Sequence, residues 1–191
     1  MAMTPQEIIS KLGPLSKLAG KWEGAKGDDM SPDDDRTSTE NNKYLERLTL
    51  EPFGPVNNHE QEMYGLRYSM MAWRLGVEDA FHEEVGYYLW DPKAKQVMKC
   101  FIVPRGISVI AGGTVEPNAK EFKIAAKLGS PTYGIASNQF LDVEFKTTYY
   151  EIKFKIEDDQ TFTYEQDTHI VMKNRKDIFH HTDKNTLKKV K

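Results

Sequence analysis

The chain has 191 residues, of which 39% are hydrophobic and 29% charged, and its formal net charge is −3. This length suits one domain with a sizeable core, and the small net charge provides no field that would attract nucleic acid. The single cysteine, Cys100, excludes an internal disulfide and predicts a reducing, cytoplasmic setting. We expect no signal peptide and no membrane span, because no basic segment precedes an apolar core and no long apolar run occurs.

The N-terminal segment predicts a short helix. Thr4 and Glu7 stand three residues apart and form a capping box, and Pro5 occupies the first helical position. Gly13 ends this helix, and we expect one more helical turn over residues 14–18. These residues should cover one end of the structure that follows.

Trp22 lies between Gly20 and Gly24 on what we predict to be the first strand. The glycines lack a Cβ, so a neighbouring chain or a ligand can approach the backbone closely. A large indole at this place, directly after a helical lid, favours a plug at the closed end of a β-barrel. A core tryptophan flanked by turn glycines and a ligand site both remain open on these residues alone.

Residues 28–42 are polar, rich in Asp, Ser and Thr, and show no apolar periodicity. This composition predicts a long solvated loop. The aspartates of the segment do not indicate calcium, because the spacing and the glycine of a calcium-binding loop are missing.

From Lys43 onward the sequence alternates between strand patterns and short turns, without a helical period. The first strand of this region covers residues 43–51 and ends before Pro52, and a loop over 129–142 interrupts the later strands. The predicted strands are residues 43–51, 60–75, 80–90, 96–103, 107–115, 121–128, 143–156, 161–172 and 182–190. The turns are too short for parallel crossovers, so the sheet should be antiparallel.

About ten such strands either stack as a sandwich or close into a barrel. We favour an all-β, up-and-down barrel, which with this number of strands can hold a small ligand. The expected organisation is one domain over 1–191, with 5–18 as the helical cap and 20–190 as the barrel.

The strand predicted over 43–51 carries a polar residue in an apolar position. Tyr44, Leu48 and Leu50 share one face, and Glu46 falls on that same face. The pattern still indicates a half-buried strand.

Few residues form a pattern that indicates catalysis. No zinc motif and no nucleophile elbow occur, and Cys100 lies within a strand, where a thiol is usually an inert small hydrophobe. Glu83 and Glu84 are adjacent, and so are His180 and His181; on a strand, adjacent side chains point to opposite faces. Only one member of each pair can therefore face the barrel interior.

Three segments in order resemble the signatures of the nitrobindin family of heme-binding β-barrels: residues 18–26, 82–88 and 181–190. Three more resemble a longer bacterial branch of fatty-acid-binding-like barrels: 102–106, 111–113 and 179–187. Two departures occur, because Lys26 replaces the last glycine of the first signature and the C-terminal segment is one residue longer. On a strand, one extra residue turns a side chain to the other face unless a bulge absorbs it.

The resemblance implies a ten-stranded barrel related in shape to lipocalins and fatty-acid-binding proteins. It also implies that the barrel mouth holds ferric heme b, with one histidine of the last strand as its axial ligand. The matching position is His181, and the extra residue keeps His180 as the alternative. Activity towards nitric oxide or peroxynitrite, including peroxynitrite isomerisation, is implied if heme is bound. We expect further cofactor-binding positions at Trp22, Gly24, Lys26 and Arg105. Of these, Lys26 and Arg105 are cations that would meet the heme propionates.

A metal-binding imidazole needs a hydrogen-bond acceptor on its other nitrogen, and Asp183 lies on the same face two residues from His181. The apolar walls of such a site could come from Met70, Met98, Met172, Phe101 and Tyr150. The alternative function is a heme-free carrier of a fatty acid or another small apolar ligand. The partner expected in either case is a small molecule inside the barrel, not nucleic acid or a membrane, and the choice between monomer and homodimer stays open.

Overall fold

The computed structural model describes residues 3–190, so Lys191 and the first two residues of the predicted domain lie outside the described residues. Two short helices come first, α1 (Pro5–Lys11) and the 3₁₀ helix η1 (Gly13–Leu18). The Thr4 hydroxyl accepts from the backbone N–H of Glu7, and the Glu7 side chain accepts from the backbone N–H of Thr4. The predicted capping box and the predicted additional helical turn are thus confirmed.

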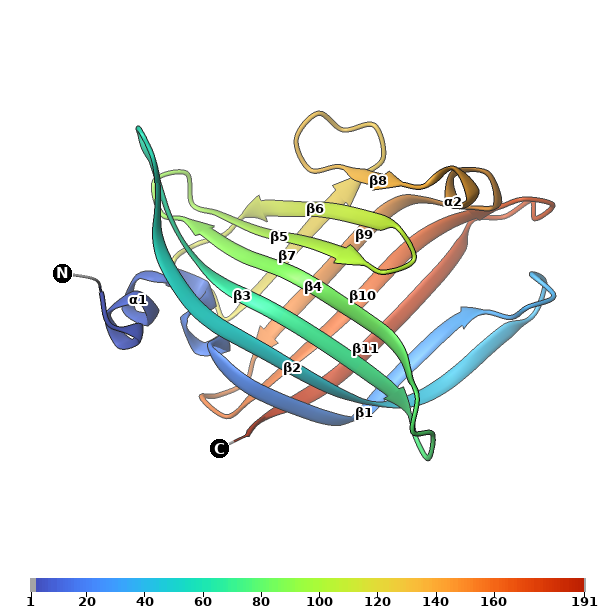
Figure 1. Ribbon diagram of the computed structural model, residues 1–191, viewed down its shortest axis with the longest axis horizontal. Coiled ribbons are helices and arrows are strands. Elements are labelled where there is room, and N and C mark those ends of the chain that lie inside the picture. The colour runs from blue at the N-terminus through green and yellow to red at the C-terminus, as the bar shows by residue number, and fades with distance from the viewer. Residues whose placement is uncertain (1–2, 191) are drawn as a thin grey trace.

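Ten antiparallel strands close into a barrel (Figure 1), which confirms the predicted fold class. Neighbours in sequence pair throughout most of the sheet, β1 pairs with β11, and a β5–β6 pairing joins the two ends. The strands are β1 (Gly20–Pro32), β2 (Thr39–Asn58), β3 (Gln61–Arg74), β4 (Ala80–Asp91), β5 (Gln96–Val103), β6 (Ile107–Thr114), β7 (Glu121–Lys127), β9 (Phe145–Ile156), β10 (Thr161–Met172) and β11 (Phe179–Val190).

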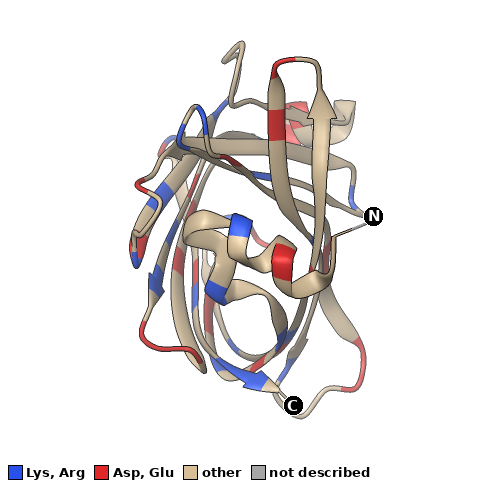
Figure 2. Ribbon diagram, turned by 90° about the vertical axis from the view of Figure 1, so that its left-hand side faces the viewer, with Lys and Arg blue, Asp and Glu red and all other residues tan. Residues whose placement is uncertain are grey.

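The helices lie across one end of this barrel (Figure 2). Beneath them Trp22 is only 2% exposed, and its indole N–H donates to the carbonyl oxygen of Leu18 at 2.7 Å. The Trp22 ring packs edge-on against Phe162, with 4.7 Å between the ring centroids. Trp22 is therefore the apolar plug of the closed end, as predicted.

The predicted loop over 28–42 is wrong. β1 continues to Pro32 and β2 begins at Thr39, so the two strands stay paired up to a turn over 33–38. Asp28 forms an ion pair with Lys43 on the neighbouring strand at 2.9 Å, whereas Asp29 is buried inside the barrel. The apolar alternation that marks a strand fails here because the interior itself is polar.

Two other boundaries also differ from expectation. β2 runs to Asn58 and does not end at Pro52 as predicted. A proline removes only one backbone donor and leaves its acceptor in place, so the strand continues beyond it. The predicted loop over 129–142 contains the short strand β8 (Ile135–Ser137), which pairs with β6, and the start of helix α2 (Gln139–Glu144). Among the helices described, none is long and apolar enough to cross a membrane.

Candidate ligand-binding site

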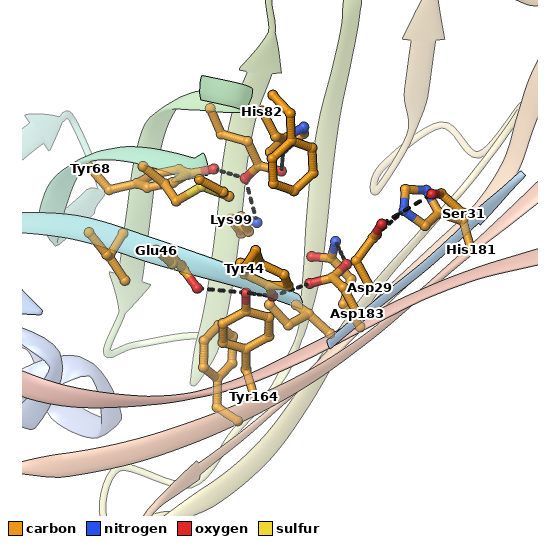
Figure 3. A pocket seen from close by; sticks show the side chains of 18 of the residues that line it. Asp29, Ser31, Tyr44, Glu46, Tyr68, His82, Lys99, Tyr164, His181 and Asp183 are labelled. Atoms are coloured by element: carbon orange, nitrogen blue, oxygen red, sulfur yellow. Dashed lines mark hydrogen bonds and ion pairs between the residues drawn. The ribbon is translucent and has the colours of Figure 1, made fainter. Parts of the chain in front are cut away.

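A cavity of about 210 Å³ lies inside the barrel, towards the end opposite the helices (Figure 3). β1 places Trp22 at the closed end and Asp29 at the cavity, seven residues further along the strand. β11 runs the other way and brings His181 and Asp183 to the same level. The cavity is lined by apolar side chains such as Leu48 and by ionisable side chains.

His181 points into this cavity and binds a buried carboxylate. Its Nε2 lies 2.7 Å from Oδ1 of Asp29, and its side chain is 32% exposed. Asn42 and Ser31 also donate to Asp29. Burial alone would raise the pKa of Asp29, but the bonds from His181, Asn42 and Ser31 outweigh it and lower that pKa. The acceptor for His181 is therefore Asp29 and not the predicted Asp183.

His180 lies on the outer face of the same strand. It is exposed, and its Nδ1 lies 2.8 Å from Oδ2 of Asp167, another outward side chain. The strand alternation thus sends His180 and His181 to opposite faces, as the sequence predicts. Glu83 and Glu84 divide in the same way, with only Glu84 buried in the interior.

Glu84 and Lys99 form an ion pair inside the barrel, and both side chains are 4% exposed. The ammonium of Lys99 lies 2.9 Å from Oε2 of Glu84, which also accepts from the hydroxyl of Tyr68. His82 lies beside the other oxygen at 3.2 Å. Burial opposes ionisation of Glu84, but Lys99 and His82 together hold its pKa well below the ordinary value. This carboxylate is therefore charged and fully paired.

A chain of hydrogen bonds continues from Lys99 across the interior. Lys99 donates to the hydroxyl of Tyr150 at 2.9 Å, and Tyr150 donates to Oε1 of Gln166 at 2.6 Å. The Gln166 amide donates to Oδ2 of Asp183 at 2.7 Å. This network joins β5, β9, β10 and β11, and of its members hydrophobic periodicity identifies only Tyr150.

A second carboxylate group lies on the β1–β2 side of the cavity. The Tyr164 hydroxyl donates to Oε2 of Glu46 at 2.8 Å and lies 2.8 Å from the hydroxyl of Tyr44. Asn185 also donates to Glu46, from a position against Gly24, where a Cβ would come within 2.9 Å of its amide. Burial raises the pKa of Glu46 to about 7, although both hydrogen bonds favour the charged form.

Asp183 is the other carboxylate with a raised pKa. Burial raises its pKa to about 6, against the attraction of His181. No cation as close as Lys99 is to Glu84 lies beside Asp183 or Glu46 among the described residues. Near neutral pH the interior can therefore hold or release protons at two carboxyl groups, while Glu84 stays charged.

The predicted cofactor positions are distributed over three places. Arg105, in the β5–β6 turn, lines the cavity together with His181. Trp22 lies beneath the cavity, behind Phe162, and Gly24 makes room for Asn185. Lys26 is exposed on the outside, because a bulge between Gly24 and Gly27 shifts the register of β1 there.

The predicted apolar wall is only partly present. Met70 lines the cavity, and Phe101 and Tyr150 pack inside the barrel, where both rings surround the Lys99 ammonium. Met98 lies next to Lys99 on the opposite, outer side of its strand, and Met172 is buried near the end of β10 away from the cavity lining.

Sequence reasoning did not select the interior residues Asp29, Glu84, Lys99, Tyr164 and Gln166. Two signals were available: Glu46, a carboxylate in register with the apolar face of its strand, and the adjacent Glu83 and Glu84, of which one must face the interior. An acid in such a position needs partners on neighbouring strands, which are Tyr164 for Glu46 and Lys99 for Glu84.

Comparisons with known proteins agree with this architecture. A family model described as "THAP4-like, heme-binding beta-barrel domain" matches residues 11–189. The crystal structure of Rv2717c from M. tuberculosis has a TM-score of 0.66 to this chain at 18% sequence identity, and the match covers 100% of both chains. No curated protein sequence matches the chain.

Proposed function

We propose a heme-dependent function for this chain, which belongs to the THAP4-like family of heme-binding β-barrel domains. The proposal is that heme b binds at the cavity and that His181 is its only protein axial ligand. The observation that carries it is the pairing of His181 with the buried Asp29 at 2.7 Å. An imidazole that binds iron characteristically engages a carboxylate through its other nitrogen, which fixes the ring and raises its basicity.

The donor set fits a heme ligand. Asp29 occupies Nε2 of His181, and Nδ1 has no hydrogen-bond partner among residues 3–190. One ring nitrogen is thus held by the carboxylate, and the other is free for a metal. The cavity lining adds apolar surface from Met70 and Phe81, and Arg105 supplies a cation for a carboxylate substituent.

The size of the cavity limits how such a group can bind. Its volume of about 210 Å³ lies below the range of about 300–1,000 Å³ that encloses drug-sized ligands. A porphyrin would therefore be enclosed only in part and would remain accessible at the mouth. Arg105 lines this cavity and favours an anionic substituent there, whereas Arg74, which also lines it, forms an ion pair with Glu40 at 3.3 Å.

When bound, ferric heme would supply the binding of nitric oxide and the isomerisation of peroxynitrite that the resemblance to nitrobindins implies. The chain's own residues control charge and protons around it. Lys99 provides a fixed positive charge next to Glu84, and the carboxyl of Glu46, with its pKa raised to about 7, can hold a proton. The Tyr164 hydroxyl keeps Glu46 oriented towards the interior.

A heme-free carrier of a fatty acid has less support from the interior. An alkyl chain in the cavity would contact the carboxylates of Glu46, Glu84 and Asp183, which are satisfied by other polar groups. Placing apolar surface against them returns no hydrogen bond and excludes the water that could solvate them.

Absorption spectroscopy with hemin tests the proposal. We expect the wild type to shift the Soret band of hemin with a stoichiometry of one, and His181→Ala to abolish the shift. His180→Ala is the matched control and should leave the shift intact, because His180 faces outward. Asp29→Asn should weaken hemin binding by about 10- to 100-fold, the usual effect of removing the partner of a metal ligand.

Circular dichroism of each variant separates lost binding from lost folding. Absence of any Soret shift in the wild type would remove the heme proposal. A shift lost in His180→Ala alone would transfer the ligand to His180, and a shift retained in a folded His181→Ala would exclude His181.

A further inference from the structure

We propose that the outer face of β10 and β11 carries a binding site for a divalent transition-metal ion, formed by Asp167, His169 and His180. The three side chains each offer one ligand atom, and these atoms all lie within 4.8 Å of one another. The site is separate from the cavity, because all three residues point away from the barrel interior.

Strand register brings the three ligands together. His169 and His180 are directly opposite each other on the antiparallel pair β10–β11, and their ring centroids lie 4.2 Å apart. Asp167 is two residues before His169, so it projects from the same face of β10. The pairing of β10 with β11 thereby brings all three residues into one cluster on the outer face.

The carboxylate of Asp167 already lies between the two imidazoles. Its Oδ2 is 2.8 Å from Nδ1 of His180 and 3.3 Å from Nε2 of His169. Two ligands of a tetrahedral zinc ion, each at about 2.0–2.1 Å from the metal, lie about 3.3 Å apart. Small rotations of partly exposed side chains are therefore sufficient to surround an ion.

A second observation also indicates a binding site at this carboxylate. Oδ1 of Asp167 is shielded from solvent and has no hydrogen-bond partner among the described residues. A buried carboxylate oxygen without a partner is costly, and such groups in proteins commonly bind an ion or an ordered water. A metal ion bound by this carboxylate would compensate the unpaired Oδ1.

The ligand types define the class of ion. Two imidazoles and one carboxylate suit Zn²⁺, Cu²⁺ and Ni²⁺, whereas Mg²⁺ and Ca²⁺ require sets of oxygen ligands. Three protein ligands leave at least one coordination position for water or for a small anion.

The neighbouring charges are compatible with a cation. Glu151 is directly opposite Asp167 on β9, and it accepts from the hydroxyl of Tyr149 at 2.7 Å. Lys123 neutralises Glu151 through an ion pair of 2.9 Å, so that this acid is not a competing ligand. The Tyr149 ring packs against His169, with 4.9 Å between the centroids, and restrains that imidazole.

The experiment is a titration of the metal-free full chain with Zn²⁺, followed by calorimetry, and with Cu²⁺, followed by electron paramagnetic resonance. We expect one Zn²⁺ per chain and a Cu²⁺ spectrum that shows coupling to two imidazole nitrogens. His169→Ala, His180→Ala and Asp167→Asn should each weaken Zn²⁺ binding by at least about tenfold, the lower limit seen for partners of metal ligands.

His59→Ala is the matched control, because His59 lies in the exposed β2–β3 turn and should leave Zn²⁺ affinity unchanged. His180→Ala should also retain the hemin Soret shift, so this result does not depend on the heme proposal. The metal site is overturned if the wild type does not bind Zn²⁺ or Cu²⁺, or if the three variants bind like His59→Ala. In those cases Asp167 only links the two histidines by hydrogen bonds.

Discussion

The two ends of the barrel are built from the same strands and differ in what they bury. At the closed end Trp22, Phe162 and Leu187 are almost fully buried and make a continuous apolar core. At the other end the same β-sheet encloses Glu84 and Lys99, which are equally buried but charged. Burial of apolar area stabilises the first end directly, whereas the second is stable only while each polar group has a partner.

Within one sheet, the closed end contributes mainly to stability, and the other end holds the groups that can act on a ligand. At the closed end Trp22, Phe162 and Leu187 carry no ionisable group, and burial of their apolar area keeps this end folded. The mouth end instead contains a histidine with a carboxylate partner and two carboxyl groups with raised pKa values. Substitutions at the two ends should therefore fail for different reasons.

Trp22→Ala should have the largest effect. It removes the indole that packs on Phe162 and its hydrogen bond to Leu18, and we expect a loss of about 3–5 kcal/mol in the free energy of unfolding. Denaturant titration followed by circular dichroism measures it. The control is Lys26→Ala on the exposed bulge of β1, which should change stability by less than about 0.5 kcal/mol. A similarly small change for Trp22→Ala would contradict the role of this residue as a plug.

Lys99→Met tests the polar end. The substitution leaves the buried carboxylate of Glu84 without its cation, and we expect a loss of about 3 kcal/mol in the free energy of unfolding. Adding Glu84→Gln should recover most of that loss, because the uncompensated charge is then absent. This recovery of stability by a second substitution distinguishes the polar end from the closed end. At the closed end, no second substitution would restore the apolar contacts that Trp22→Ala removes. A double variant as unstable as the sum of both single changes would refute this account.

The smallest effect should be the pH dependence that Glu46 confers. Burial raises its pKa from 4.5 to about 7 in the folded state, so the native protein retains a proton that the unfolded chain has released. The contribution of Glu46 to stability is complete below about pH 4.5 and is lost as the pH rises through 7, with a total of about 3 kcal/mol.

Glu46→Gln cannot release this proton, and its amide oxygen can still accept from Tyr164 and Asn185. The variant should therefore gain in stability relative to the wild type between pH 5 and pH 8. Denaturant titrations of both proteins across this range measure the difference. If that difference is independent of pH, Glu46 does not titrate as described.

By itself, the sequence determined the features that local rules control. The capping box at Thr4 begins the first helix, Trp22 plugs the barrel beneath the cap, and period-two alternation identifies strands such as β9. The same alternation decided that His180 and His181 face opposite sides, because that result depends only on their being consecutive on a strand. Each of these features can be recognised from residues close together in the chain, although Trp22 completes its packing against the distant Phe162.

Tertiary structure alone decided which polar residues meet. Asp29 contacts His181 across 152 positions of sequence, and Asp167 contacts His180 because β10 and β11 pair in one particular register. The hydrophobic pattern also fails over 28–42, since strands that surround a polar cavity carry polar residues on both faces. Closure of the barrel fixes the register of every strand, and the register determines which distant side chains become hydrogen-bond partners.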